Sequence, residues 1–175
     1  GLLVVAKDNE THEALAKQFF DRKVSRLYEA IVWGVPELTS VKLDQPLGRH
    51  PIHRKKFSIR TDGKRAITNW KNIKDYKCLS LLKCKLETGR THQIRVHLSS
   101  VGHPLLGDPL YGKYRDFGQK LPVEVKNALR SFKGQALHAK TLGFKHPKNQ
   151  DWLEFNSDLP DKMKKITSLL DDHLI

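Results

Sequence analysis

The stretch from Leu86 to His97, LETGRTHQIRVH, concentrates side chains that can bind anions or move protons. Around a turn at Gly89 it holds two arginines, two histidines, two threonines and a glutamine. Where such residues follow a strand and open a helix, side chains and backbone N–H groups meet at one rim of a sheet, a common place for anion binding and chemistry. The stretch fits equally well a plain helix start, capped by Thr91, with a solvated Arg/His face.

The elements that would position these side chains follow from the apolar pattern around them. Ile94 and Leu98 recur at helical spacing, and Gly102 is a natural residue to end a helix. We therefore predict a strand, a turn at residues 88–89 and a short helix over residues 91–101.

A second candidate site is the segment Arg49–Lys56, RHPIHRKK, which carries four formal positive charges and two histidines. We predict an exposed loop in which Arg49, Arg54, Lys55 and Lys56 contact nucleic-acid phosphates, with a merely solvated loop as the alternative. The whole chain has 32 Lys and Arg against 19 Asp and Glu, and this formal charge of +13 favours a polyanionic partner. Charge alone does not distinguish RNA from DNA or acidic lipid.

Length and composition indicate one globular domain. Its 175 residues suffice for a core, and 38% hydrophobic with 29% charged residues does not fit disorder. No apolar run approaches the ~20 residues that a membrane-spanning helix needs, and residues 1–6 lack the basic flank of a signal peptide. Cys78 and Cys84 share one face of a predicted strand, and we expect both to be buried, reduced thiols.

The remaining pattern predicts strands in the middle of the chain, with helices between them and at its end. Val24 to Trp33 should be a central strand covered on both sides, because both of its faces carry apolar residues. The other expected elements are a strand over 2–6, a helix from Asn9 or Thr11 to Asp21, strands over 66–70, 78–87, 135–144 and 152–156, a loop over 102–112 with special backbone angles, a helix begun by Pro122, and a terminal helix over 161–173. This order is typical of an α+β fold with a largely antiparallel sheet.

Five stretches together resemble the RluA-type RNA pseudouridine synthases. They occur in that family's order and cover nearly the whole chain: RLYEAIVWG at 26–34, GKRAITNW at 63–70, TGRTHQIRVH at 88–97, GHPLLGDPLYG at 102–112 and LHAKTLGFKHP at 137–147. The resemblance implies the pseudouridine synthase fold, which is a long, bent, largely antiparallel mixed sheet with flanking helices and a central cleft. It also implies the isomerisation of uridine to pseudouridine in RNA.

The resemblance further implies roles for individual residues. The reaction breaks the N1–C1′ bond of uridine and rejoins the uracil through C5, so it needs a nucleophilic carboxylate, a cation that keeps it ionised and a pocket for the base. Arg95 matches the arginine that pairs with the catalytic aspartate. Tyr28 matches the tyrosine that packs against the base, and its phenol is a candidate for proton transfer at C5. Ile94 would form the floor of the base pocket, and Arg90 and His92 would bind RNA backbone or the turn.

One departure concerns the nucleophile itself. In the family the catalytic aspartate lies in an HRLD-x-x-T/S-G motif whose last glycine runs into a strand like GLLVVAK, and this sequence begins with GLLVVAKD. Residues 1–175 therefore correspond to a pseudouridine synthase catalytic domain without its first segment, and we expect them to be inactive alone. A non-catalytic RNA-binding domain is the alternative, and an upstream aspartate in the HRLD context would discriminate between the two.

A metal site is the competing enzyme class, because His92, His97, His103 and Asp108 lie close in sequence. The first two are not at the i, i+4 spacing of a helical zinc pair and no CxxC occurs, so we expect neither metal nor cofactor. The expected partner is RNA, foremost large-subunit ribosomal RNA, with transfer RNA as the alternative substrate. We expect no membrane contact, a monomer and a cytoplasmic location.

Overall fold

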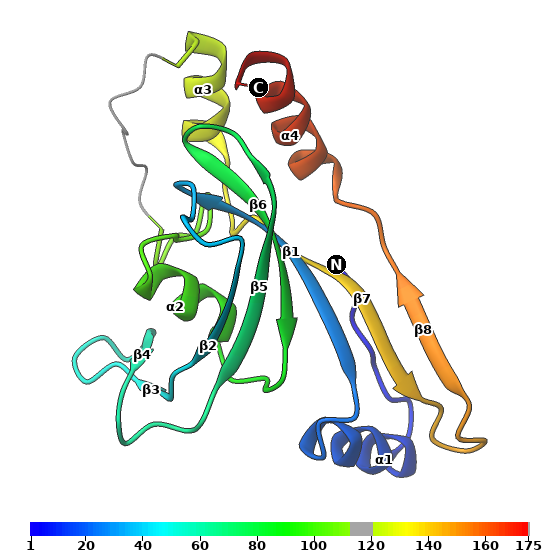
Figure 1. The fold of residues 1–175 in the computed structure, drawn as a ribbon. Coiled ribbons are helices and arrows are strands. Elements are labelled where there is room, and N and C mark those ends of the chain that lie inside the picture. Colours follow the sequence, from blue (N-terminus) through cyan, green and yellow to red (C-terminus); the bar gives the residue numbers. More distant parts are fainter. Residues whose placement is uncertain (113–120, 175) are drawn as a thin grey trace.

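The computed structural model describes residues 1–112 and 121–174, which contain four helices and eight strands (Figure 1). The helices are α1 (Asn9–Phe20), α2 (Gln93–Ser100), α3 (Val123–Ser131) and α4 (Asp161–Leu174). The strands are β1 (Ser25–Trp33), β2 (Ser40–Asp44), β3 (Leu47–Arg49), β4 (Phe57–Ile59), β5 (Ile67–Asp75), β6 (Leu79–Leu86), β7 (Leu137–Lys145) and β8 (Trp152–Asn156).

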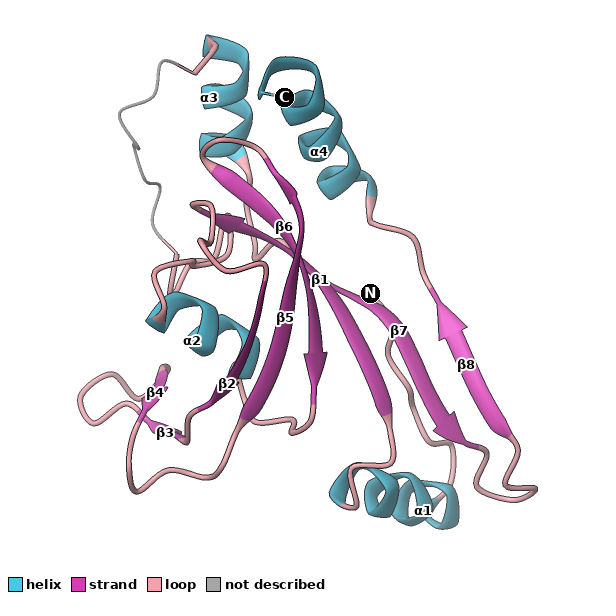
Figure 2. Ribbon diagram, in the orientation of Figure 1, coloured by secondary structure: helices cyan, strands magenta, loops and turns pink. Residues whose placement is uncertain are grey.

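Six strands form one sheet in the order β2-β5-β6-β1-β7-β8, and β3 and β4 form a separate hairpin. Every pairing within the six-stranded sheet is antiparallel. Figure 2 shows α2 against the β2–β5–β6 part of the sheet, α1 near the start of β1, and α3 beside α4 at the opposite end. The predicted α+β class, with a largely antiparallel sheet and flanking helices, is confirmed.

Strand β1 is central, as predicted, and pairs with β6 on one side and β7 on the other. All residues from Ala30 to Trp33 are buried, and alternate residues enter different cores. Ile31 and Trp33 pack with residues of α3 and α4, whereas Ala30 and Val32 pack with residues of α2. A strand covered on both faces needs no hydrophobic–polar alternation, which explains its apolar character at this end.

The first half of β1 is more open. Its residues from Ser25 to Glu29 are half-buried, and the register against β7 shifts between Leu27 and Tyr28. Tyr28 therefore lies where the strand passes from a partly open to a fully covered part of the sheet.

Residues 2–6 are extended but do not form the predicted strand. Leu2 donates one backbone hydrogen bond to Ala139 of β7, and no ladder follows. Alternate residues still point inward against α1, while Leu3 and Val5 are 84% and 74% exposed. The prediction of burial is thus correct for one side of this segment. No strand forms, because β7 already pairs with β1 and β8.

Three helix starts differ from the prediction. Helix α1 is capped by Asp8, whose carboxylate accepts the Thr11 N–H at 2.7 Å, rather than by either residue predicted. Helix α2 begins at Gln93 instead of Thr91, because His92 has a left-handed backbone with φ 56°. Helix α3 begins directly after Pro122, one residue later than predicted.

The sequence analysis missed β2, β3 and β4, which are only 5, 3 and 3 residues long and therefore too short to show a clear periodicity. In the loop 102–112, Gly102 and Gly107 have positive φ of 88° and 70°.

Cys78 and Cys84 are free and buried, as expected, but they belong to different hydrophobic cores. No helix of residues 1–112 and 121–174 is long and apolar enough to cross a membrane.

Candidate active site

The Gln93 side chain fixes the turn that precedes α2. Its Oε1 accepts the Thr88 hydroxyl at 2.7 Å and the Arg90 N–H at 2.9 Å. Its Nε2 donates to the Ile67 carbonyl at 2.9 Å and to Thr68 Oγ1 at 3.0 Å. All hydrogen-bonding positions of this buried amide are thus used, and the turn is attached to β5 by an amide instead of a threonine cap.

His97 belongs to the same scaffold. Its Nε2 lies 2.9 Å from the Gln45 carbonyl, which can only accept, so Nε2 carries the proton. Its Nδ1 then accepts the Thr68 hydroxyl at 2.9 Å. Burial lowers the pKa of His97. His103 also forms a hydrogen bond, with the Trp33 carbonyl at 3.0 Å. His97 and His103, two of the residues considered as metal ligands, thus bond to groups of the protein itself.

Arg95 projects from α2 to the loop 102–112 and forms a two-point ion pair with Asp108. Its Nε donates to Oδ2 at 2.7 Å and its Nη2 to Oδ1 at 2.8 Å. The two side chains are only 9% and 0% exposed. Oδ1 of Asp108 also accepts the N–H groups of Leu110 and Tyr111, at 2.9 and 3.1 Å. Among the described residues, Nη1 of Arg95 has no hydrogen-bond partner.

The electrostatics of this pair keep both members charged. Burial by itself would raise the pKa of Asp108, but the hydrogen bonds from Arg95, Leu110 and Tyr111 outweigh it and hold that pKa below its usual value. The hydrogen bond to Asp108 in turn raises the pKa of Arg95. The carboxylate therefore sets the direction of the guanidinium plane and leaves one edge available.

Tyr111 connects the ion pair to the β3–β4 hairpin. The Arg95 Cζ lies 5.0 Å from the Tyr111 ring centroid. The phenol oxygen accepts the Phe57 N–H at 2.7 Å and lies 3.0 Å from His92 Nδ1, so its own proton is placed to bond to the imidazole. Burial raises the pKa of Tyr111 and lowers that of His92. One side chain thus touches the arginine, the hairpin and the turn.

Tyr28 lies on the sheet face that α2 covers. It packs on the apolar cluster that contains Ile94, the neighbour of Arg95. No hydrogen bond joins Tyr28 to Arg95 among the described residues, so the structure places both on one side of the sheet without direct pairing. Across the strand, Tyr28 faces Ala139, and Gly1 packs so tightly on Ala139 that a Cβ at Gly1 would collide with its backbone.

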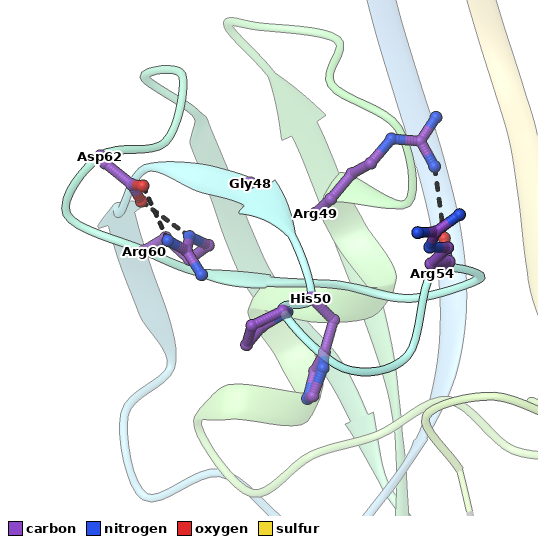
Figure 3. Close-up of a pocket in the computed structure, with 7 residues that line it drawn as sticks. Gly48, Arg49, His50, Arg54, Arg60 and Asp62 are labelled. Carbon is purple, nitrogen blue, oxygen red and sulfur yellow. Dashed lines mark hydrogen bonds and ion pairs between the residues drawn. The ribbon is translucent and has the colours of Figure 1, made fainter.

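The basic segment forms the exposed connection between β3 and β4 (Figure 3). Arg49 crosses the loop, donating from Nη1 to the Arg54 carbonyl at 3.2 Å, with its guanidinium 5.5 Å from the Phe57 ring. Arg54 and Lys55 are exposed, as predicted, and Lys56 Nζ lies 6.0 Å from the Tyr111 ring. A pocket of about 730 Å³ is lined by Gly48, Arg49, His50, Pro51, Arg54, Arg60 and Asp62.

A second pocket, of about 420 Å³, joins this hairpin to the turn before α2. Arg49 and Phe57 line one side, and Gly89, Arg90 and Thr91 line the other. Arg90 is exposed and its Nε donates to the Arg65 carbonyl at 3.1 Å. The two candidate stretches of the sequence, far apart in the chain, therefore form one cationic surface.

Sequence reasoning missed Asp108 and Tyr111 as partners of Arg95. Asp108 was considered as a metal ligand, and both residues lay in the loop 102–112, for which only special backbone angles were predicted. The available signal was an acidic and an aromatic residue in a Gly/Pro-rich loop directly after a helix that carries an arginine. This pattern suggests residues that could pair with Arg95. Which of them does so depends on how the loop 102–112 packs against α2.

Comparison with known proteins gives consistent results. The family model described as RNA pseudouridylate synthase matches residues 1–100. "Ribosomal large subunit pseudouridine synthase D" of Zymomonas mobilis subsp. mobilis is 45% identical over 172 residues, covering 97% of this chain and 52% of that protein. The Pseudomonas aeruginosa protein of the same name is 42% identical over 171 residues, covering 97% and 53%. This chain thus spans about half the length of the curated relatives it matches.

Two solved structures share the fold. Human RNA Pseudouridylate Synthase Domain Containing 4 matches with a TM-score of 0.72 at 23% identity, covering 94% of this chain and 69% of that one. Human RNA Pseudouridylate Synthase Domain Containing 1 matches with a TM-score of 0.69 at 23% identity, covering 95% and 74%.

Proposed function

The chain belongs to the RNA pseudouridylate synthase family, and on that premise we propose that residues 1–175 form most of a catalytic domain that isomerises specific uridines in large-subunit ribosomal RNA. The relatives at 42–45% identity carry the name of a large-subunit enzyme, which favours ribosomal over transfer RNA. A cytoplasmic location and action as a monomer belong to the same proposal.

The observation that carries the proposal is the setting of Arg95. Its guanidinium is almost buried, is oriented by Asp108 through Nε and Nη2, and keeps Nη1 for another acceptor. A second carboxylate placed at that edge would be held ionised by a fixed cation. This is the requirement for a nucleophilic aspartate in the isomerisation of uridine.

The position of Gly1 supports an upstream origin for that carboxylate. Gly1 lies against Ala139, the cross-strand partner of Tyr28. In a longer polypeptide, the residues directly before Gly1 would therefore start beside Ala139 of β7, one strand away from Tyr28. There Tyr28 would pack on the target base, with Ile94 as the floor of its pocket.

The wider cationic surface would bind the RNA backbone. Arg49, Arg54, Lys55 and Lys56 on the hairpin would contact phosphates, and Arg90 and His92 would bind at the turn. The chemical step and the affinity for RNA thus depend on different residues.

Pseudouridine mapping on two polypeptides tests the proposal. Full-length protein incubated with unmodified large-subunit ribosomal RNA should convert a small set of uridines, while residues 1–175 alone should bind that RNA without conversion. Transfer RNA serves as the competing substrate. Binding without conversion by both polypeptides would instead favour a non-catalytic RNA-binding domain, and conversion by residues 1–175 would overturn the upstream nucleophile.

A further inference from the structure

Arg26, at the open end of β1, has no counterion among the described residues. It lies two residues before Tyr28, so both side chains project from the same face of the strand. The guanidinium charge of Arg26 and the Tyr28 phenol are close enough to interact electrostatically. Arg26 therefore lies beside the residue that would hold the target base.

The side chain of Arg26 is held in place by packing. Its Cζ lies 5.4 Å from the Phe19 ring centroid, and a Cβ on Gly89 would collide with its Nη1. Its Nε is shielded from solvent and has no hydrogen-bond partner. None of the ion pairs formed by the described residues includes Arg26.

A half-buried guanidinium whose Nε is shielded from water without a partner among the described residues is unfavourable in the free protein. Burial lowers the pKa of Arg26, although the group stays protonated near neutral pH. The same features favour an incoming anion, because the side chain is already oriented and attraction is stronger where water is excluded. The planar fork of arginine matches a phosphate at two points.

We propose that Arg26 binds a phosphate of the RNA strand next to the uridine that enters at Tyr28. The inference rests on the proposed function, since it names the group that the substrate presents to this cation. Gly89, which Nη1 of Arg26 touches, also lines the pocket between the hairpin and the turn. Arg26 thus continues the cationic surface of Arg49 and Arg90 toward the base pocket.

Binding of a single-stranded RNA oligonucleotide with a target uridine to full-length protein tests this site. Arg26→Gln should weaken binding on the order of tenfold, as loss of a hydrogen bond to a charged group does. It should also reduce the slope of log K against log salt by about 0.7, the value for one phosphate on a single strand. Arg26→Lys should keep the salt slope but lose part of the affinity.

Lys83→Gln is the matched control. Lys83 is exposed and pairs with Glu29 in the neighbouring strand register, so it projects from the other face of the sheet. Its replacement removes the same charge and should change the salt slope little. Equal effects of Arg26→Gln and Lys83→Gln would overturn the site and leave only general charge.

The melting temperature of the free proteins identifies the anion. If Arg26 binds RNA phosphate, Arg26→Gln should leave the free protein as stable as wild type or more stable, because an unpaired charge is removed. If Arg26 pairs instead with a carboxylate of the upstream segment, Arg26→Gln should lower the melting temperature without changing the salt slope, and the inference is wrong. Wild-type protein that fails to bind RNA would refute the proposed function itself.

Discussion

At the residue scale, the buried ion pair between Arg95 and Asp108 joins α2 to the loop 102–112. The two hydrogen bonds from Arg95 to Asp108 fix the orientation of the guanidinium, which under the proposed function would face a reacting carboxylate. Because both side chains are almost buried, removal of either leaves a desolvated charge behind. Substitutions here should therefore affect stability as well as chemistry.

Arg95→Ala should destabilise the fold by about 3–5 kcal/mol, since the Asp108 carboxylate remains buried without its cation. In full-length protein that still folds, the single-turnover barrier should rise by about 2–4 kcal/mol or more, as when other preorganised electrostatic partners are removed. Arg95→Lys should lose much of the rate, because an ammonium cannot make the two-point contact with Asp108. Urea unfolding and single-turnover rates at saturating RNA measure the two effects.

Arg90→Ala is the comparison for that experiment. Arg90 is exposed and lines a surface pocket, so its loss should weaken RNA binding more than the chemical step. A near wild-type rate for Arg95→Ala together with an inactive Arg90→Ala would mean that the other arginine of the motif serves the reaction.

His97 makes stability depend on pH. Burial holds its folded pKa below the value of ~6.5 expected in the unfolded chain, so its contribution is fully present above that pH. As pH falls below 6.5 the unfolded chain binds the proton first, and stability should decrease by up to about 1.4 kcal/mol per pH unit until the folded pKa is reached. Urea titrations between pH 7 and 5 measure this slope.

A substitution of the exposed His53 provides the control for that titration. Its pH profile should keep the wild-type slope, whereas His97→Gln should flatten it. A wild-type slope in His97→Gln would show that other groups control the stability in this range.

At the scale of elements, α2, the loop 102–112 and the β3–β4 hairpin act as one unit because Tyr111 touches all three. Its ring lies against Arg95, its N–H bonds to Asp108 and its hydroxyl accepts the Phe57 N–H. Strands β3 and β4 form a ladder only with each other, while Leu47 bridges to Lys64 and packs with Val96 of α2, so the Tyr111 hydrogen bond is one of several restraints on the hairpin.

Tyr111→Phe should loosen the hairpin while keeping the ring over Arg95. The Phe57 N–H loses its acceptor in a half-buried place, at a cost of about 1–3 kcal/mol. Amide hydrogen exchange of residues 50–57 should accelerate, and RNA binding should weaken. Residues of β6, which lie inside the six-stranded sheet, should exchange as in wild type. Unchanged exchange in the hairpin would show that Tyr111 does not restrain it.

At the scale of the whole molecule, the charge of +13 is distributed so that the hairpin and the turn before α2 share one surface. Long-range attraction from such a surface raises affinity for any polyanion and weakens with salt. Such attraction does not distinguish one RNA sequence from another, so under the proposed function the choice of uridine would depend on other contacts.

The affinity for single-stranded RNA should fall steeply with salt, by about 0.7 in log K per log unit of salt for each phosphate contacted. Replacing Arg54, Lys55 and Lys56 together by Glu should weaken binding to all RNA sequences alike, because Arg54 and Lys55 face solvent on the hairpin and Lys56 is half-buried beside them. Filter-binding titrations at several salt concentrations measure both effects. An unchanged affinity would place the RNA elsewhere.

Much of this architecture was predictable from local pattern. The apolar residues of β1 on both faces predicted a covered central strand, and charge composition predicted the exposed basic hairpin loop. Residues 2–6 and the starts of α1 and α2 were assigned less well. A strand forms only where a neighbouring strand has an unpaired edge, and a helix begins where a side chain accepts its first free N–H groups. Neither condition can be read from a short stretch of sequence.

By itself, the sequence determined the fold class through its apolar periodicity, and the family resemblance of its motifs implied Arg95 and Tyr28 as candidate site residues. Only the tertiary structure decided which groups meet. It selected Asp108 for Arg95, Tyr111 for the hairpin, and no anion for Arg26 among the described residues. The reason is physical: burial makes an unpaired charge costly and a paired one directional, and burial arises only when distant segments pack together.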